Sequence, residues 1–197
     1  MKILETEIFD LITEARNKAR GYAGFFGWSS DRDIEEWGVV TCLVESLERE
    51  GEILFTSLKR RGRPNDPPDC EALNFDWKRV AIEVTELVDE KAIKNYKSGA
   101  IHEYANWDKT KFIESLQKLL SRKDSKYPKL KEPPYDGGYI VVVHTDEEML
   151  DRITVEAYLA RHKFENIKYV TRAFLLLSYD PSIEMCPYYE LKLGITI

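Results

Sequence analysis

Two carboxylic acids on neighbouring predicted strands are the residues of this sequence best suited to chemistry. Asp69 begins a predicted strand over 69–75, and Glu83 lies inside a second one over 80–87, with a short turn between them. A hairpin this short places the two carboxylates side by side. They repel each other unless a cation lies between them, and hard oxygen ligands with open positions suit Mg²⁺ or Mn²⁺. A metal ion held there would lower the pKa of a bound water and stabilise a pentavalent phosphate.

Strand alternation indicates which face of the sheet carries this pair. In a strand, alternate side chains share a face. Ile82 and Val84 then point to the core, while Glu83 and Thr85 share the other face. The segment before Asp69 is rich in proline and glycine, so it is expected to be an irregular lead-in.

The elements that must position these residues follow from hydrophobic periodicity. A change of period from about 3.6 to about 2 predicts an α/β domain with a mixed sheet flanked by helices. One domain over 1–197 is expected, with a core over 31–145, an N-terminal helical extension over 1–30 and a C-terminal α/β addition over 146–197. The predicted helices cover 4–15, 31–51, 109–123 and 150–163, and the further strands cover 53–58, 139–144, 173–179 and 188–195.

The Asp and Glu, together with the element order, resemble the PD-(D/E)XK nuclease superfamily, which has the restriction-endonuclease-like fold. The order helix, strand, strand with Asp, strand with Glu-x-Lys, helix, strand fits residues 33–145. The resemblance implies that Asp69 and Glu83 bind metal and that the backbone carbonyl of Val84 adds a ligand. The chain departs from the pattern at the lysine, whose position is taken by Thr85. Because threonine carries no charge, a cation from elsewhere is needed.

The predicted helix over 109–123 offers that cation. Lys123 lies three, four and seven residues after leucines of the apolar face, so it points toward the sheet, and we expect it to be the third catalytic residue. Gln117 is a weaker substitute. The resemblance also implies a glutamate from the first core helix, and both Glu36 and Glu45 remain candidates.

Charge and composition suggest a partner and a compartment. The net charge of −6 argues against a protein that simply coats nucleic acid, yet a basic run precedes the predicted metal site, where a phosphate backbone would lie. Three cysteines without a CxxC pair favour the cytoplasm, and no secretory signal or membrane-spanning run is recognised. A homodimer is also considered. The predicted nucleic-acid contacts are Lys59, Arg60, Arg61 and Arg63.

Three functions fit these features. The first is a metal-dependent nuclease that hydrolyses phosphodiester bonds of DNA or RNA. The second is a catalytically inactive protein of the same fold that acts as a binding or assembly module, because the strand lysine is missing. The third is an unrelated α/β protein with an interaction role, in which Glu83 is only a solvated polar residue and the prolines before Asp69 form an ordinary turn.

Overall fold

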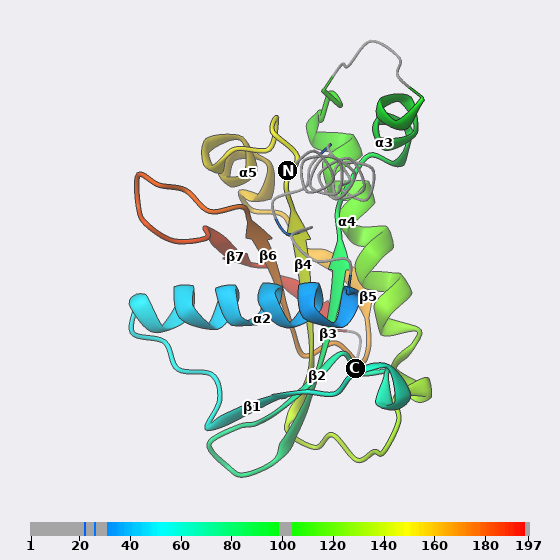
Figure 1. Cartoon of the computed structure of the whole chain (residues 1–197), viewed down its shortest axis with the longest axis vertical. Coiled ribbons are helices and arrows are strands. Elements are labelled where there is room, and N and C mark those ends of the chain that lie inside the picture. The colour runs from blue at the N-terminus through cyan, green and yellow to red at the C-terminus, as the bar shows by residue number, and fades with distance from the viewer. Residues whose placement is uncertain (1–21, 23–25, 27–30, 99–103, 196–197) are drawn as a thin grey trace, which may run out of the picture.

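The computed structural model describes residues 22, 26, 31–98 and 104–195, so the predicted helix over 4–15 lies outside the described residues. The described part is a mixed α/β structure in which helices cover a central sheet (Figure 1), as the sequence predicted. Its helices are α2 (Arg32–Arg49), α3 (Glu90–Lys97), α4 (Lys109–Asp124) and α5 (Arg152–Leu159). Its strands are β1 (Ser57–Arg60), β2 (Cys70–Leu73), β3 (Arg79–Glu86), β4 (Gly138–Thr145), β5 (Phe164–Ile167), β6 (Arg172–Leu177), β7 (Tyr188–Glu190) and β8 (Leu193–Ile195).

The main sheet has six strands in the order β1-β2-β3-β4-β6-β7. The pairs β1–β2, β2–β3 and β6–β7 are antiparallel, whereas β3–β4 and β4–β6 are parallel. β2 and β3 therefore form the predicted hairpin. Its turn is closed by Asn74, whose side-chain oxygen accepts hydrogen bonds from the backbone N–H groups of Asp76 and Lys78 at 3.0 Å each.

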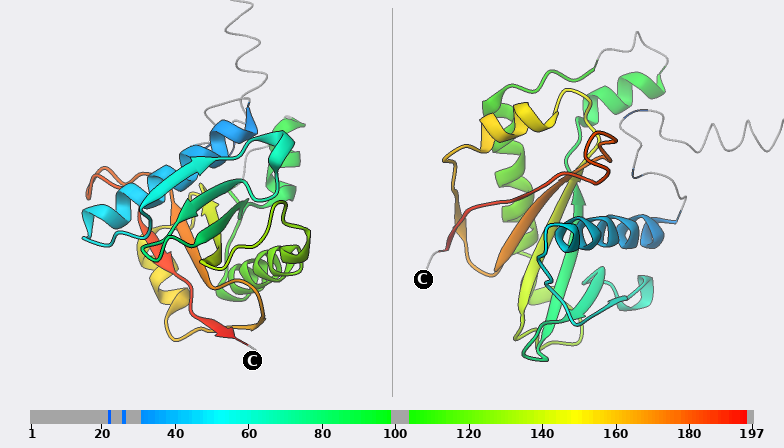
Figure 2. Two further views of the ribbon diagram at one scale, coloured as in Figure 1. Left: turned by 90° about the horizontal axis from the view of Figure 1, so that it is seen from below. Right: turned by 90° about the vertical axis from the view of Figure 1, so that its left-hand side faces the viewer.

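The central strands are buried on both faces, with α2 on one side of the sheet and α4 with α5 on the other (Figure 2). Ile82 and Val84 pack in the cluster that α2 covers, as the alternation predicted. The neighbouring positions Ala81, Val141 and Val143 pack in the cluster that α4 covers. Glu83 and Thr85 share the face of Ala81, so they point into the α4 layer and not into solvent.

Asp31 caps the start of helix α2, where its side chain accepts a hydrogen bond from the N–H of Asp33, and the helix ends shortly before the positive-φ residue Gly51. Both ends agree with the prediction, because an aspartate caps the first turn and glycine tolerates the left-handed conformation. The residues that α2 buries against the sheet are Val39, Val40, Leu43, Ser46 and Leu47.

Helix α4 presents one buried stripe to the sheet. Phe112, Leu116 and Leu120 are completely buried, and Lys123 continues the same stripe with 5% of its surface exposed. The helix register therefore places a lysine ammonium in the layer that faces Glu83, as its spacing predicted.

Four elements differ from the sequence prediction. β1 starts at Ser57 and not at Ile53, because pairing with β2 begins where Thr56 donates its N–H to the carbonyl of Leu73 at 2.8 Å. The predicted strand over 188–195 is divided between β7 in the main sheet and β8, which pairs with β5 in a second sheet. The elements α3 and β5 were not predicted. Among the described residues, no helix has the length and apolar character of a membrane span.

Candidate active site

The hairpin brings Asp69 and Glu83 together. Asp69 directly precedes β2, and the register pairs Cys70 with Ile82, so Asp69 lies beside Glu83 on the neighbouring strand. Both side chains are buried, with 5% and 3% of the residue surface exposed. The N–H of Val84 donates a hydrogen bond of 2.7 Å to Oδ2 of Asp69, which fixes the orientation of that carboxylate.

A third carboxylate, which the sequence analysis did not single out, joins this pair. Asp66 lies in the proline-rich segment, and carboxylate oxygens of Asp66, Asp69 and Glu83 lie within 4.8 Å of one another. The two prolines at 67 and 68 separate Asp66 from Asp69 and exclude a regular helix or ladder there. An acid three residues before Asp69 was the signal available in the sequence, but its direction depends on how this turn folds.

Lys123 reaches the same point from α4. Its Nζ forms an ion pair with Oε2 of Glu83 and lies 4.0 Å from Oδ2 of Asp69. The hydroxyl of Tyr139 donates a hydrogen bond of 3.1 Å to the backbone carbonyl of Lys123, which ties the last turn of α4 to β4. The three residues named as catalytic thus converge within hydrogen-bonding or ion-pair range.

Burial and neighbouring charges perturb the carboxylates of the cluster. Burial raises the pKa of the Asp69 carboxyl, the charge of Glu83 raises it further, and the Lys123 ammonium opposes both effects. The guanidinium of Arg32 also interacts electrostatically with Asp69 and Asp66. The three carboxylates offer oxygen atoms of the type that divalent cations such as Mg²⁺ and Mn²⁺ prefer. Asp66, Asp69 and Glu83 are the side chains that would hold it, and the Val84 carbonyl stays a predicted ligand.

An open cleft of about 570 Å³ lies beside the cluster, lined by residues of α2, β3 and α4. Glu36 lines this cleft with a side chain that is 12% exposed, and it accepts a hydrogen bond of 2.5 Å from Nε of Arg32. Burial raises the pKa of Glu36, and nearby Arg32 and Lys123 oppose the increase. Glu45 is exposed and does not line the cleft. Of the two glutamates left open by the sequence, Glu36 is therefore the one beside the site.

Thr85 and Gln117 have different surroundings. Thr85 lines the cleft, and its hydroxyl accepts a hydrogen bond of 3.0 Å from a terminal nitrogen of Arg122. Arg122 was another residue that the sequence analysis did not single out. Gln117 instead bonds the backbone of Glu165, donating to its carbonyl at 3.0 Å and accepting from its N–H at 3.2 Å. It joins α4 to β5 and does not line the cleft.

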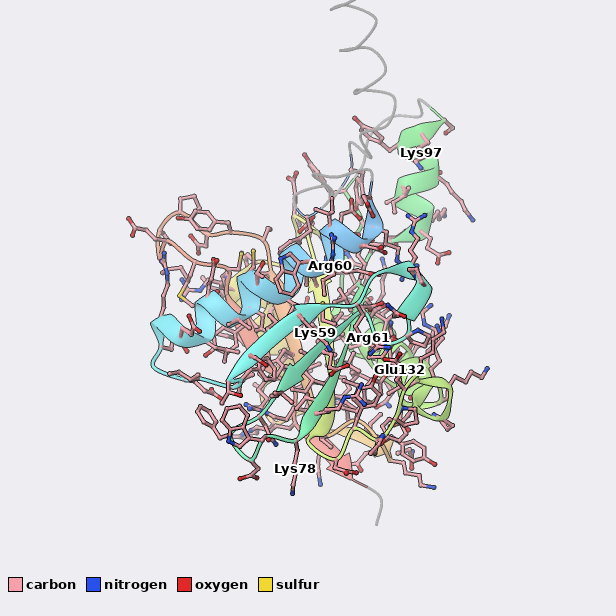
Figure 3. The ribbon with its side chains drawn as sticks, turned by 60° about the horizontal axis from the view of Figure 1, so that its bottom comes forward. Lys59, Arg60, Arg61, Lys78, Lys97 and Glu132 are labelled. Carbon is pink, nitrogen blue, oxygen red and sulfur yellow. The ribbon has the colours of Figure 1, made fainter. Side chains whose placement is uncertain are left out.

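The four basic residues predicted to contact nucleic acid divide into two kinds. Arg61 has a side chain only 3% exposed, and it bridges Glu71 at 2.9 Å and Glu132 at 2.8 Å; Arg61 and Glu132 are labelled in Figure 3. Its guanidinium is thus already paired with carboxylates of the protein itself. Arg60 and Lys59 on β1 are exposed, and so is Arg63, although Lys59 lies 3.4 Å from Glu71 and Arg63 lies 3.7 Å from Asp33.

Comparison of the chain with protein-family models, with curated proteins and with solved structures finds no match. Any proposal of function therefore rests on the geometry of the site.

Proposed function

We propose that the protein is a metal-dependent nuclease that hydrolyses phosphodiester bonds in DNA or RNA. The observation that carries this proposal is that the buried side chains of Asp69, Glu83 and Lys123 lie close together beside an open cleft. Burying two carboxylates next to each other is unfavourable unless the arrangement serves a cation or a reaction. A cluster of this kind at a cleft is a reasonable candidate for acid–base or metal chemistry.

The order of elements supports the resemblance to the PD-(D/E)XK superfamily. α2 is followed by β1, by β2 with Asp69 directly before it, by β3 with Glu83 and Thr85, and then by α4 and β4. This is the order that the resemblance implied, with α3 added between β3 and α4. Membership of the superfamily is part of the proposal.

Each residue has a definite role in this proposal. Asp66, Asp69 and Glu83 would hold Mg²⁺ or Mn²⁺, with the Val84 carbonyl as a further ligand. The ion would supply a water of lowered pKa and positive charge against the phosphate. Lys123 would orient that water and offset negative charge that develops on the phosphate, which Thr85 cannot do. Glu36, on the opposite wall of the cleft, would act as an accessory acid.

The second candidate is a catalytically inactive protein of the same fold that binds nucleic acid or assembles with a partner. Two observations favour it specifically: the Lys123 ammonium is already paired with Glu83, and β3 carries no lysine at the position of Thr85. Arg60, Lys59 and Arg63 would serve either function as contacts with the phosphate backbone. A homodimer and a cytoplasmic location are retained as predictions, to be checked by light scattering and by fractionation of cells.

Two measurements test the main proposal. Calorimetric titration with Mn²⁺ is expected to show binding by the wild type and its loss in Asp69→Ala, while the matched control Glu45→Ala on exposed α2 surface binds normally. Incubation with single- and double-stranded DNA and RNA is then expected to give metal-dependent cleavage by the wild type and by Glu45→Ala only. Metal binding without cleavage of any substrate would favour the inactive module. Equal Mn²⁺ binding by wild type and Asp69→Ala would refute the metal site itself.

A further inference from the structure

Arg122 stands next to the candidate active site and is held by a neutral partner. A terminal nitrogen of its guanidinium donates a hydrogen bond of 3.0 Å to the hydroxyl of Thr85, which is only 9% exposed. Thr85 occupies the position where the resemblance implies a lysine. Where the resemblance implies a charged lysine on β3, this chain has the hydroxyl of Thr85, and that hydroxyl contacts the charged guanidinium of Arg122 on α4.

The charge of Arg122 is not neutralised by this contact. Within residues 31–98 and 104–195, neither Arg122 nor Lys126 forms an ion pair with a carboxylate. Arg61 and Arg79 differ in this respect, since both are paired with Glu71. A guanidinium has five N–H donors in a fixed fork, so a single bond to Thr85 orients it and leaves donors for an anion.

Arg122 and Lys126 lie on the same wall of the cleft as Lys123. Lys126 is the second residue after α4, and its N–H donates to the carbonyl of Lys123 at 2.9 Å, so the chain continues the helical turn. Four residues along a helix correspond to about 6 Å and to nearly the same direction. The two cations therefore form a short basic row beside the buried carboxylates. The acids that line the cleft, Glu35, Glu36, Glu86 and Glu90, come from other elements than α4, so an anion is favoured at the α4 wall.

We propose that Arg122 binds a phosphate of the nucleic-acid strand next to the scissile one, that Thr85 is its positioning residue, and that Lys126 contacts a neighbouring phosphate. This inference rests on the proposed function and names the substrate contacts of the same site. A planar guanidinium matches two phosphate oxygens at once, which an ammonium does not. It also explains the threonine of Glu-x-Thr, because the hydroxyl aims the arginine without cancelling its charge.

Binding of a labelled oligonucleotide as a function of NaCl concentration tests this assignment. The parent is Asp69→Asn, in which cleavage is expected to be abolished, with Mg²⁺ present and with a single strand and a duplex as probes. Adding Arg122→Met is expected to weaken binding about 10-fold and to lower the slope of log K against log salt by about one. Lys126→Met should give a smaller change in the same direction. The control Lys109→Met, an exposed lysine at the far end of α4, should stay within about 2-fold of the parent.

The role of Thr85 is tested by a pair of substitutions in the same background. Thr85→Val removes the hydroxyl and is expected to weaken binding about 3-fold, the order expected for losing one neutral hydrogen bond, whereas Thr85→Ser keeps the hydroxyl and should restore the parent affinity. Arg122→Lys should restore the salt slope but only part of the affinity. If Arg122→Met lowers the melting temperature but leaves the oligonucleotide affinity and its salt slope unchanged, the proposal is overturned, because Arg122 then serves only to anchor α4. A parent that binds neither probe would overturn it as well.

These outcomes can be separated from those of the nuclease proposal, because oligonucleotide binding does not require cleavage. A wild-type protein that binds through Arg122 but cleaves no substrate refutes the nuclease proposal and leaves the phosphate contact standing. Conversely, if the single variant Arg122→Met cleaves with the same KM and kcat as the wild type, only the phosphate contact is refuted.

Discussion

At the scale of single residues, the register of α4 determines where Lys123 lies, because it turns this side chain toward the candidate site. It is buried on the face of α4 that also carries Leu116 and Leu120, and it forms an ion pair with Glu83. A buried ammonium is costly without partners, so Glu83 and Asp69 account for its place in the core. Lys123 also lines the open cleft beside these carboxylates.

We predict that Lys123→Ala lowers the cleavage rate about 100-fold or more, the usual cost of removing one contact to the transition state. Its Mn²⁺ affinity should be no weaker than that of the wild type, because the carboxylates remain and lose a competing cation. Single-turnover cleavage and Mn²⁺ titration measure the two effects. Lys118→Ala, an exposed change on the same helix, should cause only a small salt-sensitive loss of binding. Equal, measurable cleavage by Lys123→Ala and wild type would refute the catalytic role of Lys123.

Asp69 provides a second prediction, which concerns stability. Without metal, the Asp69 and Glu83 carboxylates repel each other in a buried site, whereas an asparagine oxygen at position 69 can still accept the hydrogen bond from Val84. Asp69→Asn should therefore raise the melting temperature in EDTA. Saturating Mn²⁺ should stabilise the wild type, by about 2.7 kcal/mol at 100 times the Kd, and should not stabilise the variant. Thermal unfolding with and without Mn²⁺ decides this, and identical metal responses of both proteins would contradict it.

At the scale of elements, Glu71 ties the first three strands together. This buried residue of β2 accepts hydrogen bonds from Arg61, after β1, at 2.9 Å and from Arg79, at the start of β3, at 2.8 and 2.9 Å. Those bonds lower the pKa of Glu71 to about 2. Since Glu71 pairs with Ala81, these ion pairs hold β2 and β3 together two residues away from Asp69 and Glu83.

The depressed pKa of Glu71 has a definite consequence for pH dependence. The ion pairs contribute their full stability above the ordinary pKa of 4.5 and lose it as the pH falls toward about 2. Glu71→Gln should lower the free energy of unfolding at pH 7 by about 2 kcal/mol, as expected for a lost charged hydrogen bond. Between pH 4.5 and 2 the variant should lose less stability than the wild type. Urea unfolding at several pH values measures this, and parallel pH profiles would show that these ion pairs contribute nothing.

At the scale of the whole molecule, one sheet separates two apolar layers. Val142 of β4 packs in the layer under α2, and Val141, its neighbour in sequence, packs in the layer under α4. Because both layers share the same strands, we expect them to unfold together. Val141→Ala and Val142→Ala should each lower the free energy of unfolding by about 2 kcal/mol.

Calorimetry on both valine variants checks this cooperativity. A single transition whose calorimetric and van't Hoff enthalpies agree is expected in each case. Two separated transitions, each sensitive to only one of the variants, would instead indicate that the layers are independent units.

The periodicity of the sequence determined much of the element pattern, because side-chain period is a local property of helices and strands. It placed α2, α4, β3 and the β2–β3 hairpin, and therefore the pairing of Asp69 with Glu83. It missed α3 and β5, which are short, and it did not resolve the division of 188–195 between two sheets, since pairing partners are not local.

Only the tertiary structure decided which further side chains lie near Asp69 and Glu83. The way α2 lies across the sheet brings Glu36 to the cleft and leaves Glu45 exposed, although both lie on one helix. The fold of the proline-rich turn adds Asp66, and the packing of α4 on β3 aims Arg122 at Thr85. Each of these contacts depends on how a helix packs on the sheet or on how a loop folds, and the period of hydrophobic residues in the sequence does not encode either. Periodicity sets only which face of an element is buried.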